Sequence, residues 1–135
     1  MDVELDIRTT ARVDIVDVTD AVEDALPDGT ETGLCTIFVP HTTAGVLVNE
    51  NEPRLVSDFE SLLERLVPSG EEYEHDAIDD NAAAHLRASI LGESVTVPIA
   101  DGALTLGTWQ SILFVDCDGP RDRRLRVSVT TRESS

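Results

Sequence analysis

The segment Ser94–Asp116, SVTVPIADGALTLGTWQSILFVD, predicts three consecutive β-strands and with them the class of the fold. Residues Ser94–Ile99, Ala103–Leu106 and Gln110–Asp116 are rich in β-branched and other apolar side chains, which are typical of strands. The pair Asp101-Gly102 is a strong signal for a tight hairpin turn between the first two of them. Strands joined by such short connections favour an antiparallel sheet.

The rest of the chain groups strands with strands and helices with helices. Further strands are expected where apolar residues alternate with polar ones or form short runs: residues 2–8, 13–16, 34–39, 45–48 and 124–129. Helices are expected after capping residues or proline: one from Asp17 or Thr19, one from Pro53 to about Leu66, and one from Asn81 to Leu91 capped by Asp79 or Asp80. The order of these elements predicts one α+β domain over residues 1–135, with a mainly antiparallel sheet.

Three features make specific predictions about burial. The strand Leu34–Val39 is nearly all apolar, which predicts that both of its faces are covered. Cys35 and Cys117 lie inside apolar, strand-like runs, so we expect buried free thiols rather than a disulfide. The only tryptophan, Trp109, is expected to pack in the core, and the edge of a functional site is the alternative.

The charge of the chain excludes several classes of partner. The chain has 27 acidic and 10 basic residues and a formal net charge of −17, and every basic residue is an arginine. A nucleic-acid binder must place basic residues along phosphates, and anionic membranes repel an acidic protein, so we expect neither partner. No segment approaches the roughly 20 apolar residues of a membrane span. Because no basic signal segment follows Met1, we expect a cytoplasmic protein.

The same acidity predicts adaptation to high salt. Acidic residues are scattered from Asp2 to Glu133 rather than gathered in one segment. Their mutual repulsion costs stability in dilute salt, and screening removes that cost, because the Debye length falls to about 3 Å at 1 M salt. We therefore expect the protein of a halophile, and an acidic patch for a basic partner is the alternative.

All three histidines lie in polar interruptions of the apolar pattern. His41 follows the strand expected at residues 34–39, His75 lies in a polar loop, and His85 lies one helical turn after Asn81. Three histidines from separate elements can converge on a zinc ion or act as acid–base groups near neutral pH. Their spacing matches no compact metal motif, so unrelated, hydrogen-bonded histidines are the alternative.

Four of the ten arginines fall within six positions: Arg121, Arg123, Arg124 and Arg126. Arg124 and Arg126 alternate with the apolar residues of the last strand and should face solvent, whereas Arg123 shares the apolar phase. Arg121 also shares it if the strand begins early. A buried guanidinium needs a bound anion, such as a phosphate or carboxylate, or a carboxylate partner in the chain. The available carboxylates are those of Asp116, Asp118 and Asp122.

Several motifs together resemble the YjbQ-like family, whose members are also described as secondary thiamine-phosphate synthases. In chain order, the matching segments are PHTTAG (40–45), VNE (48–50), YEH (73–75), DNAAAHL (80–86), SVTVPI (94–99), GTWQ (107–110) and DGPR (118–121) followed by Arg123. They occur in the order of the family and cover about residues 34–128. The resemblance implies a mixed, mainly antiparallel, sandwich-like sheet with two or three helices, and a homotrimer.

For chemistry, the resemblance implies transfer of a hydroxymethylpyrimidine unit from its pyrophosphate to a thiazole phosphate, with loss of pyrophosphate. The implied catalytic residues are His41, Glu50, His85 and Arg121. The implied substrate-binding residues are Thr42, Thr43, Asn49, Asn81, Gln110 and Arg123. Arginines would stabilise the departing pyrophosphate, together with Mg²⁺ held by Glu50. The expected partner is therefore a small phosphorylated substrate.

A metal-binding protein of hydrolytic or non-enzymatic role is the alternative function. In that case His41, His75 and His85 would hold a divalent metal cofactor, Zn²⁺ or Mg²⁺. A trimeric interaction protein is a third alternative. The chain departs from the family pattern at Glu52, where Asp is frequent, and near Ala103, where the lost basic residue would have helped to hold an anion.

Overall fold

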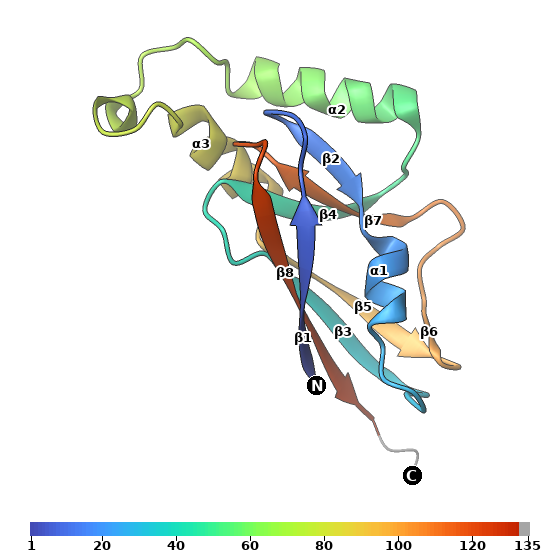
Figure 1. Ribbon diagram of the computed structural model, residues 1–135. Helices are drawn as coiled ribbons and strands as arrows, with labels where there is room; N and C mark the ends of the chain where they lie inside the picture. The colour runs from blue at the N-terminus through green and yellow to red at the C-terminus, as the bar shows by residue number, and fades with distance from the viewer. Residues whose placement is uncertain (133–135) are drawn as a thin grey trace.

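Two antiparallel sheets form the framework of the computed structural model, which describes residues 1–132 (Figure 1). The larger sheet contains, in spatial order, β1 (Asp2–Arg8), β8 (Asp122–Thr131), β3 (Gly33–Phe38), β5 (Ser94–Ala100) and β6 (Ala103–Leu104). The smaller sheet contains β2 (Asp14–Asp17), β7 (Ser111–Asp116) and β4 (Ala44–Asn49). Every strand pair among the described residues is antiparallel. The predicted α+β fold with mainly antiparallel sheet is confirmed.

The main core lies between the inner faces of the two sheets. Ile37 of β3 and Leu125 of β8 belong to the same buried cluster as Phe114 of β7 and Val46 of β4, and all four are at most 1% exposed. Side chains alternate between the two faces of a strand, so each sheet contributes every second residue to this core.

Helices cover the outer face of the smaller sheet. Leu63 of α2 (Pro53–Leu66) and Ala84 of α3 (Ala82–Leu91) pack in a second apolar cluster with Val115 of β7. The other helices of the described chain are α1 (Thr19–Asp24) and the 3-10 helix η1 (Glu74–Ala77). The small sheet is therefore the middle of three layers, with the larger sheet on one side and α2 and α3 on the other.

The strand covered on both faces is β7, and the prediction that Leu34–Val39 has this environment is wrong. β7 is the central strand of the middle layer. In β3, Cys35 is buried, but Leu34 and Phe38 are 49% and 40% exposed. An apolar run does not indicate whether a second layer covers its far face, and β3 has only one.

Two other burial predictions have opposite outcomes. Cys35 and Cys117 are buried and unpaired, as predicted. Trp109 is 73% exposed, so the prediction of a core position is wrong. The Gln110 side chain accepts a hydrogen bond from the backbone N–H of Gly107 at 2.8 Å. This contact closes the loop on itself, and Trp109 projects from it.

The helix α2 begins and ends where the sequence predicts. Pro53 occupies its first turn, and the Glu52 carboxylate accepts a hydrogen bond from the Leu55 N–H at 2.7 Å. This contact satisfies one of the free donors of the first turn. No helix in the described part of the chain is both long enough and apolar enough to cross a membrane.

The start of α3 differs slightly from the prediction. The helix begins at Ala82, and its N-cap residue is Asn81 rather than Asp79 or Asp80. The Asp76 carboxylate of η1 accepts the hydrogen bond of the Ala82 N–H at 3.0 Å. The capping group therefore comes from the preceding loop, which leaves the Asn81 side chain free for other contacts.

Candidate functional site

A pocket of about 720 Å³ lies where the β3–β4 and β7–β8 connections meet α3. Seven residues singled out from the sequence line it: His41, Thr42, Thr43, Asn81, His85, Arg121 and Arg123. Pockets of this volume suit small-molecule ligands. The pocket draws on three separate parts of the chain, so its residues come together only through the fold.

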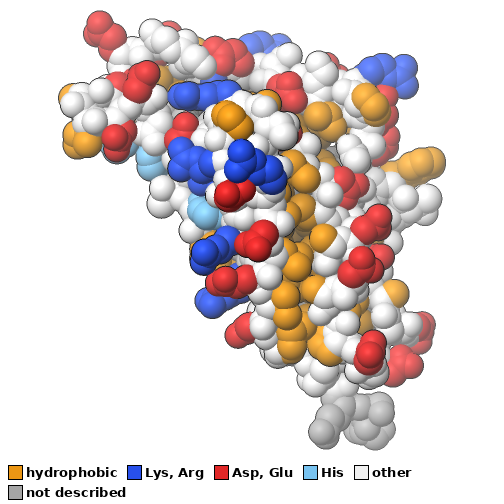
Figure 2. Space-filling view, in the orientation of Figure 1, with side chains coloured by type: hydrophobic (Ala, Val, Ile, Leu, Met, Phe, Trp, Pro, Cys, Tyr) orange, Lys and Arg blue, Asp and Glu red, His pale blue; other side chains and the backbone are white. Residues whose placement is uncertain are grey.

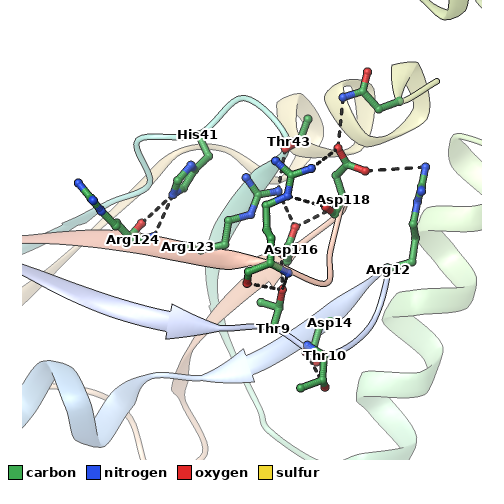
Figure 3. A network of polar contacts seen from close by, with 12 residues as sticks. Thr9, Thr10, Arg12, Asp14, His41, Thr43, Asp116, Asp118, Arg123 and Arg124 are labelled. Carbon is green, nitrogen blue, oxygen red and sulfur yellow. Dashed lines mark hydrogen bonds and ion pairs between the residues drawn. The ribbon is translucent and has the colours of Figure 1, made fainter. Parts of the chain in front are cut away.

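A buried ion pair forms one wall of this pocket. The Nη2 atom of Arg123 donates to Oδ1 of Asp116 at 2.6 Å and to Oγ1 of Thr43 at 2.8 Å (Figure 3). Burial alone would raise the pKa of Asp116, but hydrogen bonds from Arg123, Thr9 and the Asp118 N–H outweigh it and lower the pKa. Asp116 is therefore a carboxylate that fixes the position of Arg123.

Thr9 joins this ion pair to the loop that carries Arg121. Its hydroxyl donates to Oδ2 of Asp116 at 2.7 Å and accepts from the backbone N–H of Arg121 at 3.0 Å. Gly119 allows this close approach, because a Cβ atom there would lie 2.8 Å from the Thr9 hydroxyl and 2.3 Å from the Ala11 carbonyl oxygen. The sequence offered no signal for Thr9, since it lies 107 positions from Asp116.

The two arginines of the pocket keep donors that no described residue accepts. Both hydrogen bonds of the Arg123 guanidinium leave from Nη2, and its Nε atom is buried without a partner among the described residues. Arg121 is half-exposed and donates from Nε and Nη2 to the Asp118 carbonyl and carboxylate, at 3.0 and 3.1 Å. The alternative of ion pairs with neighbouring aspartates is thus realised, and guanidinium donors are still free for an anion.

His41 is held by the backbone of β8. Its Nε2 atom lies 3.0 Å from the backbone nitrogen and 3.2 Å from the carbonyl oxygen of Arg124 (Figure 3). Nε2 accepts from the N–H in one neutral tautomer and donates to the carbonyl oxygen in the other. Burial, followed by the positive charge of Arg123, lowers the pKa of His41. Near neutral pH this side chain is therefore uncharged.

The other two histidines form a pair on α3 and η1. The rings of His75 and His85 meet edge to face, with centroids 4.7 Å apart and planes at 78°. His85 lines the main pocket, whereas His75 lines a second cavity of about 370 Å³ on the far side of His85. His41 and His85 therefore share a pocket that His75 does not line.

The donor set does not fit the metal site expected from the three histidines. No group of three His, Cys, Asp or Glu side chains within residues 1–132 is arranged to hold a metal ion. The Nε2 atom of His41 is already engaged by the Arg124 backbone, and His75 lies in a different cavity. The predicted metal-binding protein built on these histidines is therefore wrong, and a divalent cofactor elsewhere stays a prediction.

Three predicted site residues lie at the other end of the smaller sheet. β4 begins beside Thr43 and ends at Asn49, which pairs with Ser111. At about 3.3 Å per residue, Glu50 lies roughly 20 Å from Thr43. Gln110 is at the same far end and is bound to its own loop. Within one chain, Asn49, Glu50 and Gln110 therefore do not line the pocket.

Comparison with known proteins gives consistent matches over nearly the whole chain. The family model described as "UPF0047 protein YjbQ-like" matches residues 3–132. A UPF0047 protein of Methanothermobacter thermautotrophicus is 51% identical, over 93% of this chain and 89% of its own. The crystal structure of a hypothetical protein from Aeropyrum pernix has a TM-score of 0.94 at 41% identity, covering 98% and 99% of the two chains. A YbjQ-like protein of unknown function from Sulfolobus solfataricus has a TM-score of 0.91 at 35% identity, with coverage of 98% and 97%.

These matches contradict the predicted thiamine-phosphate synthase. The relatives and solved structures are described as UPF0047 proteins, hypothetical proteins or proteins of unknown function. The geometry gives a physical reason as well: Glu50, expected to hold Mg²⁺ at the leaving group, lies at the opposite end of β4 from Arg121 and Arg123. Within one chain, therefore, the residues expected to act together on a pyrophosphate lie at opposite ends of the smaller sheet.

Proposed function

The chain belongs to the UPF0047 family of YjbQ-like proteins, and we propose that it binds a small phosphorylated ligand in the pocket beside Arg121 and Arg123. The observation that carries the proposal is the state of Arg123. Its side chain is only 3% exposed and is held in an ion pair with Asp116, and no hydrogen bond to a described residue leaves from its Nη1 atom. A fixed guanidinium with free N–H groups is well suited to phosphate oxygens.

The distribution of positive charge supports the same proposal. Six of the ten arginines lie on β8, on the bend before it, at the end of β1 or in the connection from β1 to β2: Arg8, Arg12, Arg121, Arg123, Arg124 and Arg126. Figure 2 shows blue side chains gathered on the same face as the pale-blue histidines. On a chain with a net charge of −17, this region holds more than half of the positively charged side chains.

Uncharged polar residues complete the setting for a phosphate group. His41, which is neutral near pH 7, and Thr42 also line the pocket. Charge-assisted bonds from the arginines and neutral bonds from these groups can share the oxygens of one phosphate. Because the pKa of His41 is lowered, its ring stays uncharged above neutral pH.

Calorimetric titration with inorganic phosphate and ethyl phosphate tests the proposal. Arg121→Gln removes a half-exposed guanidinium without touching the buried ion pair, and we expect about tenfold weaker binding of both ligands. Arg65→Gln, on the exposed side of α2, is the matched control and should leave the dissociation constants unchanged. Equal affinities in wild type and Arg121→Gln, or no binding to the wild type at millimolar phosphate, would contradict the proposal.

We also propose a homotrimer, as the family resemblance implies. Light scattering coupled to gel filtration measures the mass of the assembly in solution. A mass three times that of the 14.6 kDa chain is the expected result. A mass equal to that of one or two chains would contradict this assembly and leave the ligand proposal standing.

A further inference from the structure

A separate cavity lies between the connection that follows α1 and the turn of the β5–β6 hairpin. Its volume is about 470 Å³, and it shares no lining residue with the pocket of the two arginines. The backbone N–H of Gly102, in the hairpin turn, donates to the carbonyl oxygen of Glu31 at 3.1 Å, so the two segments lie side by side (Figure 1). A cavity of this size can hold a small organic molecule.

A buried hydroxyl without a partner belongs to this cavity. Thr30 lines the cavity and is only 7% exposed, yet its hydroxyl makes no hydrogen bond to a described residue. The other polar side chains of residues 1–132 that are buried to the same degree all make one: Thr9, Thr43, Arg87, Asp116 and Arg123. Oγ1 of Thr30 is not among the fully enclosed polar atoms without a partner, so the exposure that it keeps is towards the cavity. Buried hydroxyls in proteins are hydrogen-bonded, and here only an occupant of the cavity can supply the bond.

The cavity is strongly negative. Four carboxylates line it, those of Glu23, Asp28, Glu31 and Asp101, and no arginine or histidine does. None of the four forms a hydrogen bond or an ion pair with a described residue. Oε2 of Glu31 reaches the hairpin turn, 4.0 Å from the position that a Cβ atom on Gly102 would take. Four like charges around one opening repel each other, so the cavity favours a cation.

A compact metal ion does not match this arrangement. Ca²⁺ and Mg²⁺ need several oxygen ligands that converge on one point at about 2.0–2.6 Å. No three acidic side chains within residues 1–132 are arranged in this way. The negative charge is distributed around the cavity instead, so a cation whose charge is distributed along its length is the better match.

The lining also includes an apolar surface, formed by the half-buried side chains of Leu26 and Pro27. Methylene groups of a long cation pack on such a surface while its charged ends stay with polar groups. We infer that this cavity binds an aliphatic polyamine, with ammonium groups at the carboxylates and at the Thr30 hydroxyl, which accepts an N–H. The inference is independent of the proposed phosphate site.

NMR titration with 1,4-diaminobutane tests the inference in isotope-labelled protein. In 1 M KCl the Debye length is about 3 Å, which removes long-range attraction to the net charge. The amide signals of Thr30 and Gly102 should shift and saturate with one dissociation constant. Two probes serve as controls: 1-aminobutane lacks the second ammonium group, and Mg²⁺ has the same charge in compact form. Both should bind at least tenfold more weakly, and equal binding by Mg²⁺ would overturn the inference.

A matched pair of double variants separates the cavity from the overall charge. Asp28→Asn with Glu31→Gln should weaken the binding of 1,4-diaminobutane about tenfold. Asp58→Asn with Glu60→Gln removes the same two charges from the exposed surface of α2 and should leave the dissociation constant unchanged. Equal losses in the two double variants would show that the net charge attracts the diamine, and the inference would fail.

The Thr30 hydroxyl is tested by Thr30→Val, which keeps the shape of the side chain. Affinity for 1,4-diaminobutane should fall about fivefold while the thermal midpoint does not fall, because no hydrogen bond within the described chain is lost. Thr30→Ser retains the hydroxyl and should bind like the wild type. Wild-type affinity in Thr30→Val, or no shift of the Thr30 and Gly102 signals in the wild-type protein, would overturn the inference.

Discussion

Arg123 and Asp116 form an ion pair, with 2.6 Å between Nη2 and Oδ1, in which the two side chains are 3% and 0% exposed. The pair joins β8 of the larger sheet to the end of β7 in the smaller sheet. Removal of one member of such a pair leaves the other charged and buried, which costs more than the pair contributes. The same contact thus holds the two sheets together and positions one wall of the pocket.

The first prediction concerns this ion pair. Asp116→Ala should lower the free energy of unfolding by about 3–5 kcal/mol, because Arg123 is left without its buried carboxylate. Urea unfolding followed by circular dichroism measures the change. Asp122→Ala is the control: it removes the exposed partner of Arg8 and should cost less than about 1 kcal/mol. Similar losses in the two variants would show that the buried pair has no special role.

The second prediction concerns the Thr9 hydroxyl. Thr9→Val keeps the shape of the side chain but removes both hydrogen bonds, to Asp116 and from the Arg121 N–H, and should cost about 1–3 kcal/mol. Phosphate affinity should also fall several-fold, because the Arg121 backbone loses its anchor. Thr9→Ser retains the hydroxyl and should bind phosphate like the wild type. If Thr9→Val loses stability but no affinity, the residue is purely structural.

The third prediction concerns the titration of His41. Burial and the charge of Arg123 hold its pKa below the ordinary value of 6.5, so the unfolded chain binds more protons between these two values. The contribution of His41 to stability is therefore present above pH 6.5 and falls as the pH drops towards the folded pKa. NMR titration of the imidazole protons, assigned with His41→Asn, measures the midpoint. A midpoint at or above 6.5 would contradict the described environment.

The fourth prediction concerns salt. Because the chain has a net charge of −17 and no lysine, screening should stabilise it, and its thermal midpoint should be higher in 2 M than in 0.1 M KCl. Thermal melts followed by circular dichroism measure both midpoints. Sucrose at matched water activity is the control, since it carries no charge. Equal midpoints at the two salt concentrations would exclude adaptation to high salt.

Local signals in the sequence were sufficient for most elements of the fold. The helix Pro53–Leu66 was predictable from a proline at its start and its apolar stripe, both of which act within a few residues. Local signals did not indicate whether one face or both faces of a strand are packed against another layer. Leu34 and Phe38 look as apolar as the residues of β7, and the difference arises only from the order of the layers.

The sequence indicated which residues could belong to the candidate site better than it indicated which of them lie close together. His41 and Glu50 are nine positions apart in the sequence, but an extended strand between them carries them to opposite ends of the sheet. Thr9 and Arg121 are 112 positions apart, and the fold brings them into contact. Only the topology of the two sheets determines which of these pairs meets.

The position of Trp109 affects how this protein can be observed. It is the only tryptophan, and at 73% exposure its indole is already hydrated in the folded chain. Unfolding therefore changes the polarity around it very little, and its emission spectrum is a poor measure of core packing. Intrinsic fluorescence instead reports on the loop at residues 107–110, so a blue shift on adding a binding partner would locate that partner at this loop.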